Sequence, residues 1–428
     1  MRKFLLLILL AALVIVPVMA QEEGEPPRTG IRPDAPPYAI RGPHPVGFMT
    51  FDDGNAERPI TGAIWYPAVQ PEGIEEAIVY DGGVGDIVPF PVMNEKVGRA
   101  ILNAEPDTAA GPYPLVIGSH GLGSSIYAIA HIYEHLASNG FVIIAPIHPN
   151  DTQRMQMLVQ SDEMWADYQQ SVIESMVLRP LDISQTLDYA EVLTRPDGDM
   201  AGVIDMEQVS VIGYSYGGYT AIAAAGGQLD FSGLSEICES GVHASLAISF
   251  VCMLHADDLP EMEAQLIELT GVDAEPGEMW PSMADERIDA IVGLTPGGGT
   301  VVISDEGYAN VEVPMLLVRS GNDSVSTPEY NVNRAWEYSG CDEKAFVTLE
   351  YADHMVIGEC PAGLVEAIPD FFPYCSDPVW DMDRAHDLIN HFTTAFLLAE
   401  LYGDEDARAA LAPDAVAFPG IGYEAVGY

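Results

Sequence analysis

The sequence predicts an α/β fold: a mostly parallel central sheet flanked by helices, with a helical insertion. Three observations carry this prediction. Short continuous apolar runs, typical of strands buried on both faces of a parallel sheet, alternate with helical segments. Between residues 114 and 146, a strand, a glycine-rich loop, a helix and a second strand follow one another. Between residues 209 and 225, a strand and a small-residue helical run flank the turn Gly213-Tyr214-Ser215-Tyr216-Gly217.

The individual elements follow from the apolar pattern of each segment. Residues 69–112 contain scattered turns and predict no particular element, and the polar, methionine-rich residues 149–178 predict loops and short helices. From Leu181 to Leu193, apolar residues recur in steps of three and four, which predicts a helix. The other expected strands are Val46–Phe51, Ile60–Tyr66, Leu115–Gly118, Phe141–Pro146, Ile288–Leu294, Val313–Val318 and Ala345–Leu349, the last one; the other expected helices are Ile126–Ser138, Pro328–Tyr338 and Asp381–Leu401.

One α/β domain is expected over residues 38–428. Residues 1–20 have a basic start, an apolar run and a small residue before Gln21, which predicts a cleaved signal peptide, with an uncleaved membrane anchor as the alternative. Residues 21–37 are rich in proline, glycine and charge, and predict a disordered linker. Residues 226–286 interrupt the alternation of strands and helices with an acidic, largely helical stretch, which we interpret as a cap or lid.

The charge balance excludes one class of function. The 17 basic and 65 acidic residues give a net charge of −48. Such a surface repels phosphate backbones and anionic membranes, so we expect no nucleic-acid partner and no stable membrane insertion once the signal is cleaved. The simplest interpretation is a solvated acidic shell on a secreted or periplasmic, extracytoplasmic protein.

Export makes the five cysteines candidates for disulfides. Cys238 with Cys252 and Cys360 with Cys375 are the locally spaced pairs, which leaves Cys341 unpaired. The sequence alone leaves the pairing open.

The turn at Ser215 carries the main chemical prediction. A strand, the pattern Gly-x-Ser-x-Gly and a helix are typical of a nucleophile elbow, in which the serine sits on a strained turn that exposes its hydroxyl. A β-carbon at Gly213 or Gly217 would collide with the neighbouring strand or helix. The alternative is an ordinary glycine-rich turn.

A serine nucleophile needs a base to accept its proton and a carboxylate to orient that base. Asp323 and His354 each follow a predicted strand, in the order serine, acid, histidine. The preceding loop, residues 295–299, contains no carboxylate, which favours Asp323; Asp257 and Asp258 are weaker alternatives. We expect His120 to brace the glycine-rich loop, and the histidines at His148, His243, His255, His386 and His391 to be structural or exposed.

Attack on an ester would place negative charge on the carbonyl oxygen, and backbone N–H groups aimed at that oxygen would stabilise it. One expected donor is Tyr216, directly after the serine. The other is Leu122 in the Gly121–Gly123 loop. The alternative for this loop is a plain strand-to-helix turn.

One motif points to different chemistry. Residues 131–135 read HIYEH and match an inverted zinc-peptidase pattern, with His131 and His135 on one helix face. No separate third ligand is evident, and this helix must pack on the sheet. We therefore expect neither a metal nor a cofactor.

At this point the sequence resembles a known family. Seven segments carry the resemblance: GPHPVGF from Gly42, TGAIWYP from Thr61, GPYPLVIGSHGLGSS from Gly111, LASNGFVIIAP from Leu136, GYSYGG from Gly213, VPMLLVRSGND from Val313 and YADH from Tyr351. They are similar to the dienelactone-hydrolase-like α/β-hydrolases, in the branch near platelet-activating-factor acetylhydrolases and polyester or cutinase-like hydrolases.

The resemblance implies an α/β-hydrolase fold and an esterase or lipase. The implied catalytic triad is Ser215, Asp323 and His354, with Leu122 and Tyr216 as oxyanion donors. Two features depart from the family patterns. The cysteine nucleophile of true dienelactone hydrolases is absent, and the acid of the plasma acetylhydrolases follows an earlier strand.

Two functional hypotheses follow. The first is a secreted serine hydrolase that cleaves carboxylic esters through an acyl-enzyme, on a small-molecule, lipid or polyester substrate that the sequence does not specify. The second is a catalytically silent hydrolase-fold module that binds a partner at the cell surface. For the enzyme, the charge of −48 predicts a preference for neutral or cationic esters over anionic ones.

Overall fold

The structure is a computed structural model that describes residues 30–82, 95–152, 155–156, 158–361 and 363–428. Its main sheet has ten strands in the order β12-β11-β10-β9-β8-β6-β7-β2-β1-β5. The bounds are β1 Val46–Asp52, β2 Thr61–Pro67, β5 Ile101–Leu102, β6 Tyr113–Ser119, β7 Val142–Ile147, β8 Ile204–Tyr214, β9 Ala290–Leu294, β10 Met315–Ser320, β11 Lys344–Leu349 and β12 Ile421–Val426.

The centre of this sheet is parallel, antiparallel pairs lie toward both edges, and the edge strand β5 pairs in parallel with β1. Strands β7, β6, β8, β9, β10 and β11 pair in parallel, whereas β2 pairs antiparallel with β1 and β7, and β12 pairs antiparallel with β11. The carboxyl ends of the parallel strands therefore meet at one edge, where loops from several strands can share a site. The predicted α/β fold with a mostly parallel sheet is confirmed.

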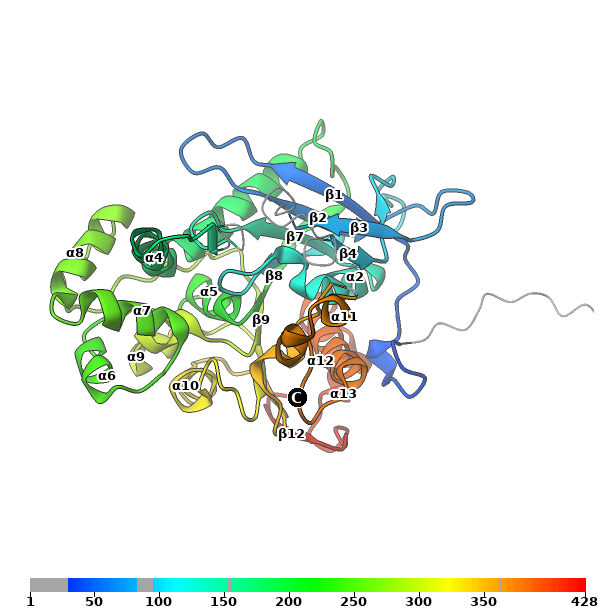
Figure 1. The fold of residues 1–428 in the computed structure, drawn as a ribbon. Coiled ribbons are helices and arrows are strands. Elements are labelled where there is room, and N and C mark those ends of the chain that lie inside the picture. The colour runs from blue at the N-terminus through cyan, green and yellow to red at the C-terminus, as the bar shows by residue number, and fades with distance from the viewer. Residues whose placement is uncertain (1–29, 83–94, 153–154, 157, 362) are drawn as a thin grey trace, which may run out of the picture.

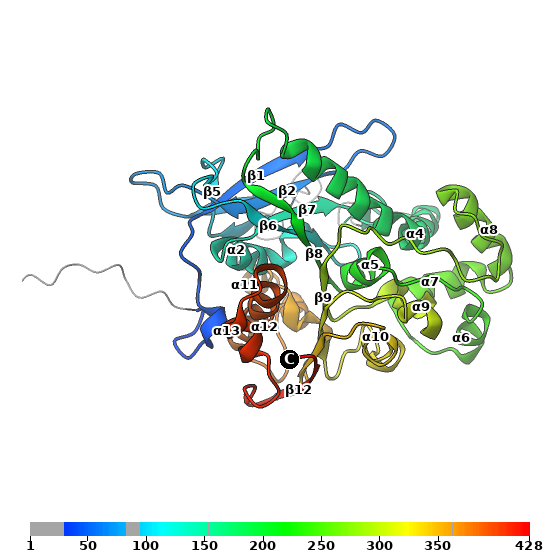
Figure 2. The same cartoon turned by 180° about the vertical axis from the view of Figure 1, so that it is seen from behind.

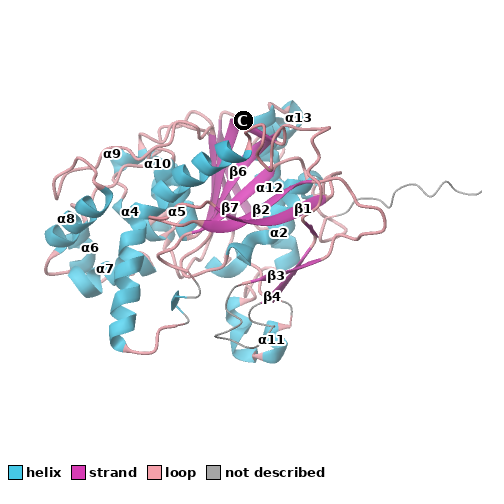
Figure 3. Ribbon diagram, turned by 90° about the horizontal axis from the view of Figure 1, so that it is seen from above, coloured by secondary structure: helices cyan, strands magenta, loops and turns pink. Residues whose placement is uncertain are grey.

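Helices cover both faces of the sheet (Figure 3). On one face lie α4 (Asp162–Leu193) and α5 (Tyr216–Ala224), which pack on Leu115, Ile117 and Val211. On the other lie α2 (Ala130–Ser138), preceded by η2 (Ile126–Ile129), and α12 (Met382–Tyr402), which pack on Val116 and Ile212. Because successive strand residues point to opposite faces, one apolar strand supplies both cores.

The remaining helices lie at the margins. The segment 226–286 contains α6 (Leu234–Ser240), α7 (Leu246–His255) and α8 (Leu259–Thr270), which gather beside α4 at one side of the molecule (Figures 1 and 2). The ring of Phe250 on α7 contacts Trp165 on α4. The other helices are η1 Pro37–Ala39, η3 Gly298–Val302, α9 Asp305–Tyr308, η4 Pro328–Tyr330, α10 Val332–Tyr338, η5 His354–Ile357, α11 Leu364–Ala367, η6 Pro369–Tyr374 and α13 Glu405–Ala410.

The prediction for residues 149–178 was wrong for its second half. A single helix, α4, runs from Asp162 to Leu193 and continues through Pro180. Ser161 caps it by accepting a hydrogen bond from the N–H of Met164. Many turns of α4 are buried on several sides, between the sheet and the helices of the insertion, so its apolar residues show no one-sided period.

The expectation that Ala345–Leu349 is the last strand was also wrong. Residues 421–426 return as β12 and cover the edge of β11. In the unassigned stretch 69–112, β3 (Ile78–Asp81) and β4 (Glu95–Gly98) form a small separate sheet. The expected helix Pro328–Tyr338 is divided into η4 and α10.

The predicted signal peptide lies outside the described residues, as does most of the predicted linker. The part of the linker that is described, from residue 30, lies against α12, where the Asp387 carboxylate accepts hydrogen bonds from the N–H groups of Ile31 and Arg32. Among the described residues, no helix combines the length and apolar character that a bilayer span requires.

Both locally spaced cysteine pairs form disulfides, Cys238–Cys252 within the insertion and Cys360–Cys375 in the loop before α12. The thiol of Cys341 is free and buried. These bonds are consistent with an extracellular protein.

Candidate active site

Ser215 occupies a strained turn between β8 and α5. Its backbone has φ 56° and ψ −115°, which is unusual for a residue with a side chain. A β-carbon at Gly213 would lie 1.9 Å from the carbonyl oxygen of Gly217, and one at Gly217 would lie 1.9 Å from that of Ser119. The expected steric need for both glycines is therefore confirmed.

The structure brings Ser215, His354 and Asp323 into one hydrogen-bonded set, here named the outer triad. His354 Nε2 lies 2.9 Å from Ser215 Oγ, and His354 Nδ1 lies 2.7 Å from Asp323 Oδ2. A carboxylate only accepts hydrogen bonds, so Nδ1 carries the proton and Nε2 is free to accept the serine proton. Ser215 is largely buried, with 8% of its surface exposed.

Neighbouring groups hold the acid and the imidazole in place. Asp323 Oδ1 accepts hydrogen bonds from the N–H groups of Val325 and Ser326, which leaves Oδ2 for the histidine. The Tyr214 ring stacks on the His354 ring at a centroid distance of 5.4 Å, and its hydroxyl donates to the His354 carbonyl oxygen. This role of Tyr214 was not predicted from the sequence. Its position directly before the serine was the sequence feature that could have indicated it.

The glycine-rich loop lies directly against Ser215. A β-carbon at Gly121 would be 3.4 Å from Ser215 Cβ. The N–H of Gly123 donates to the carbonyl oxygen of Asp151, whereas the N–H of Leu122 has no acceptor among the described residues. Tyr216 is the first residue of α5, and the N–H groups of a first helical turn have no partner within the helix. Both predicted donors therefore belong to segments that meet at Ser215.

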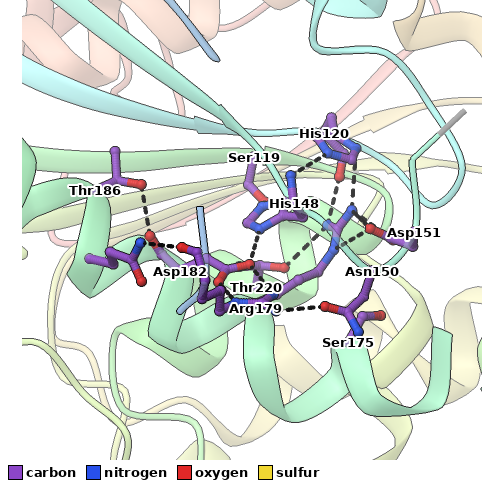
Figure 4. Close-up of polar contacts among 12 residues, drawn as sticks. Ser119, His120, His148, Asn150, Asp151, Ser175, Arg179, Asp182, Thr186 and Thr220 are labelled. Atoms are coloured by element: carbon purple, nitrogen blue, oxygen red, sulfur yellow. Dashed lines mark hydrogen bonds and ion pairs between the residues drawn. The ribbon is translucent and has the colours of Figure 1, made fainter. Parts of the chain in front are cut away.

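A second set of the same three residue types lies behind this loop (Figure 4). Ser119 Oγ is 2.9 Å from His148 Nε2, and His148 Nδ1 is 2.9 Å from Asp182 Oδ2. We name this set the inner triad; all three residues are fully buried. Burial lowers the pKa of His148 to about 4, so its imidazole is neutral. Burial alone would raise the pKa of Asp182, but hydrogen bonds from His148 and Arg58 outweigh it and lower that pKa.

Glu134 and His135 of the zinc-like motif have other partners. Glu134 accepts hydrogen bonds from the Tyr80 hydroxyl and the Arg99 N–H, and His135 Nε2 bonds the Tyr38 carbonyl oxygen. Within the described residues, no group of three or more His, Cys, Asp or Glu side chains is arranged to hold a metal ion.

An apolar cavity of about 260 Å³ adjoins the loops that carry the outer triad. Ser124 and Ser125 line it after the glycine-rich loop, Met355 lines it next to His354, and the apolar wall is completed by Tyr127, Leu364, Phe371 and Tyr374. A larger cavity of about 600 Å³ lies elsewhere, between Asp230, Glu236 and Arg334. No outer-triad residue lines either cavity, but only the smaller one is lined by a direct chain neighbour of a triad residue, Met355 beside His354.

A strand, a strained serine turn and a helix at the centre of a mostly parallel sheet define an α/β-hydrolase fold. Residues 48–197 match the family model described as platelet-activating factor acetylhydrolase, isoform II, which confirms the predicted resemblance for that part of the chain. The fold is similar to that of a ferulic acid esterase from Streptomyces cinnamoneus, with a TM-score of 0.57 and 18% sequence identity over 89% of this chain and 96% of that one. The structural likeness shows the α/β-hydrolase fold, and the family match covers residues 48–197 of it.

Proposed function

We propose that this protein is a serine hydrolase that cleaves carboxylic esters through an acyl-enzyme. The observation that carries the proposal is the continuous hydrogen-bonded set Ser215–His354–Asp323 at a strained turn. In this proposal Ser215 is the nucleophile, His354 the base and Asp323 the orienting acid.

The first half of the reaction follows from these contacts. His354 Nε2 accepts the proton of Ser215 as Oγ attacks the ester carbonyl carbon, and negative charge develops on the carbonyl oxygen. The N–H groups of Leu122 and Tyr216 are the proposed donors to that oxygen. The intermediate then collapses, the bond to the alcohol oxygen breaks, and His354 returns its proton to the departing alcohol. A water molecule then attacks the acyl-enzyme in the same way, and the carboxylic acid product is released.

The apolar cavity beside His354 suggests how the substrate is seated. Because His354 must deliver a proton to the alcohol oxygen, the alcohol part of the ester departs on the side of the histidine loop. Met355, Leu364 and Phe371 line the cavity on that side. We therefore assign the cavity to an apolar alcohol arm of the ester, whose burial supplies binding energy.

Secretion and a cap complete the proposal. The amino-terminal signal pattern, the acidic surface and the two disulfides support an extracytoplasmic location. The helical segment 226–286 is the proposed cap. It is joined to the loop after the acid, since Thr327 donates a hydrogen bond to the carbonyl oxygen of His243.

A fluorophosphonate probe tests the proposal against a catalytically silent module. The serine oxygen displaces fluoride from phosphorus, so a competent site becomes stoichiometrically labelled. We expect the probe to label Ser215 in the wild type and to leave Ser215→Ala unlabelled. Untreated wild type should hydrolyse a short p-nitrophenyl ester, whereas probe-treated wild type and Ser215→Ala should not. Folded protein that neither reacts with the probe nor hydrolyses the ester would support the silent module instead.

A further inference from the structure

A buried arginine, Arg179 on α4, contacts both segments that carry the proposed oxyanion donors (Figure 4). Its Nη1 donates to the His120 carbonyl oxygen at 2.7 Å, and its Nη2 lies 3.5 Å from the Gly121 carbonyl oxygen. Its guanidinium carbon also lies 4.6 Å from the centre of the Tyr216 ring. The side chain of Arg179 is fully buried, so its guanidinium group contacts protein atoms and not solvent.

The contacts with the loop control the direction of one N–H group. In a trans peptide the carbonyl and the following N–H point in opposite directions. The Gly121 carbonyl and the Leu122 N–H belong to the same peptide. A carbonyl held toward Arg179 therefore directs the Leu122 N–H away from the arginine, and the preceding residue Gly121 packs against Ser215.

His120 holds the same carbonyl from a second direction. The backbone N–H of His148 donates to His120 Nε2 at 3.1 Å, so the proton of the neutral ring is on Nδ1. Nδ1 then donates to the Gly121 carbonyl oxygen at 2.8 Å. Burial and the adjacent Arg179 charge hold the pKa of His120 well below its usual range, which keeps the ring in this neutral form.

The Tyr216 segment is tied to the same guanidinium. Arg179 Nη1 lies 3.4 Å from the Thr220 hydroxyl, which in turn donates to the Tyr216 carbonyl oxygen at 3.0 Å. The far end of the Tyr216 ring is held on α4, where its hydroxyl accepts from Ser175 and donates to the Val172 carbonyl oxygen. One planar group thus reaches both halves of the proposed oxyanion site.

Asp151 balances the buried charge and extends the contact. Its carboxylate lies 2.8 Å from Arg179 Nη2, and its backbone carbonyl accepts the Gly123 N–H at 3.0 Å. Burial raises the pKa of Asp151 to about 6, against the opposing effect of Arg179. Because the pair is neutral overall, its influence on the oxyanion site comes from position rather than from net charge.

We propose that Arg179, held by Asp151, is a positioning residue that aligns the Leu122 and Tyr216 N–H groups on the oxyanion. This inference rests on the proposed function. Arg179 makes no contact with Ser215 or His354 among the described hydrogen bonds, so it acts through the loop and α5. A guanidinium presents several donors in one plane, which a lysine ammonium cannot do.

Two variants test the proposal. Arg179→Lys keeps the charge but loses the planar fork, and Arg179→Met combined with Asp151→Asn removes both charges, so that no buried charge is left unpaired. The matched control is Arg287→Met, because Arg287 also pairs with carboxylates, at Asp285 and Glu191, and donates to an α4 carbonyl, at Ser184, but lies outside the loop.

The measurements separate alignment from general stability. We would determine kcat and KM for a short p-nitrophenyl ester, and the affinity for a trifluoromethyl ketone, which adds Ser215 Oγ and places negative charge on its oxygen. Loss of one oxyanion donor costs about 10²–10³ in kcat. We expect kcat and inhibitor affinity to fall together, about tenfold in Arg179→Lys and about 100-fold in the double variant, with KM within about threefold of wild type.

Circular dichroism and thermal unfolding would establish that each variant is folded, and if the double variant is not, Arg179→Lys decides. A folded variant that keeps both kcat and inhibitor affinity within about twofold of wild type would overturn the proposal, as would an equal loss in Arg287→Met. Ser215→Ala, measured alongside, keeps the two proposals apart. If Ser215→Ala hydrolyses the ester at the wild-type rate, the proposed function is contradicted. If Ser215→Ala is inactive but the Arg179 variants are unaffected, only the positioning role is contradicted.

Discussion

The outer and inner triads contain the same residue types at similar distances but sit in different surroundings. The serine-to-histidine distance is 2.9 Å in both, and the histidine-to-aspartate distances are 2.7 Å and 2.9 Å. Ser215 lies on a strained turn and is 8% exposed, whereas Ser119 ends strand β6 and is fully buried. The comparison teaches that the same three side chains, at nearly the same distances, can form both on a strained turn and in a fully closed interior, so spacing alone does not identify a reaction site.

The surroundings also give the two aspartates different tasks. Asp323 is held by backbone N–H groups and directs its second oxygen to His354. Asp182 shares its carboxylate between His148 and Arg58, whose Nη2 donates to it at 2.9 Å. The inner triad thus joins three parts of the fold, and the expectation that His148 is structural agrees with its burial.

The largest expected effect comes from the two serines. Ser215→Ala should lower kcat for a short p-nitrophenyl ester by several orders of magnitude, because the proposed nucleophile is gone. Ser119→Ala leaves His148 Nε2 buried without a donor, which should lower the free energy of unfolding by about 1–3 kcal/mol. Its kcat should stay within about tenfold of wild type. Steady-state kinetics and urea unfolding of the two variants measure these effects. A large loss of kcat in Ser119→Ala with little loss in Ser215→Ala would mean that the inner triad is the reactive one.

The two aspartates should separate in the same way. Asp323→Asn should reduce kcat by about 10⁴, because the amide no longer holds the His354 tautomer that accepts the serine proton. Asp182→Asn breaks a buried pair and should chiefly lower stability, by about 3 kcal/mol. Comparing kcat at a temperature where both variants remain folded is the decisive measurement. Equal losses of activity in the two variants would contradict the distinction.

Acid should lower the stability of the fold through the inner triad and two other buried histidines. Burial lowers the pKa of His135, His148 and His391 to about 4, below the unfolded value of about 6.5. Between these limits the unfolded chain binds protons that the folded chain does not, so the free energy of unfolding should fall as pH falls from about 6.5 toward 4.

A variant of one of these histidines sharpens the prediction. His148→Asn removes one such proton and should reduce the slope of stability against pH by about 1.4 kcal/mol per pH unit in this window. Exposed His243→Asn is the control. Urea unfolding at a series of pH values measures the slopes, and an unchanged slope in His148→Asn would contradict a neutral His148.

The cavity near the outer triad should set a smaller effect. Phe371→Ala enlarges the cavity assigned to the alcohol arm and should lower kcat/KM about tenfold for acetate esters of a bulky apolar alcohol, with little change for methyl acetate. The neighbouring Phe372 is 60% exposed and outside the cavity lining, so Phe372→Ala is the matched control. Equal effects in the two variants would argue against the assignment.

The smallest expected effect concerns the electrostatic field of the acidic surface, which would act on a charged ester approaching the outer triad. With a net charge of −48, kcat/KM should favour a neutral ester over a succinate half-ester of matched size by a few-fold at low salt. The ratio should shrink as salt is added, since screening acts over about 10 Å at 0.1 M. If the ratio does not change with ionic strength, the surface charge has no role in substrate choice and serves solubility alone.

Much of the outer triad could be predicted from the sequence because its signals are local. The glycines around Ser215 follow from the space available in a strand-to-helix turn, and the structure gives each a carbonyl at 1.9 Å from the missing β-carbon. Asp323 and His354 each follow an apolar strand, and parallel strands bring their carboxyl ends to one edge of the sheet. Order along the chain was therefore enough to select candidates.

The tertiary structure alone decided the features that depend on distant partners. Helix α4 continues through Pro180 because packing on several sides outweighs a local helix-breaking residue, and residues 421–426 become a strand because β11 offers an open edge. Arg179 reaches the His120 carbonyl across 59 residues of sequence, and His148 reaches Asp182 across 34. A buried charge or imidazole has no local pattern, since its partners are chosen by how helices and loops pack, and so the inner triad and the arginine behind the oxyanion loop emerge only in three dimensions.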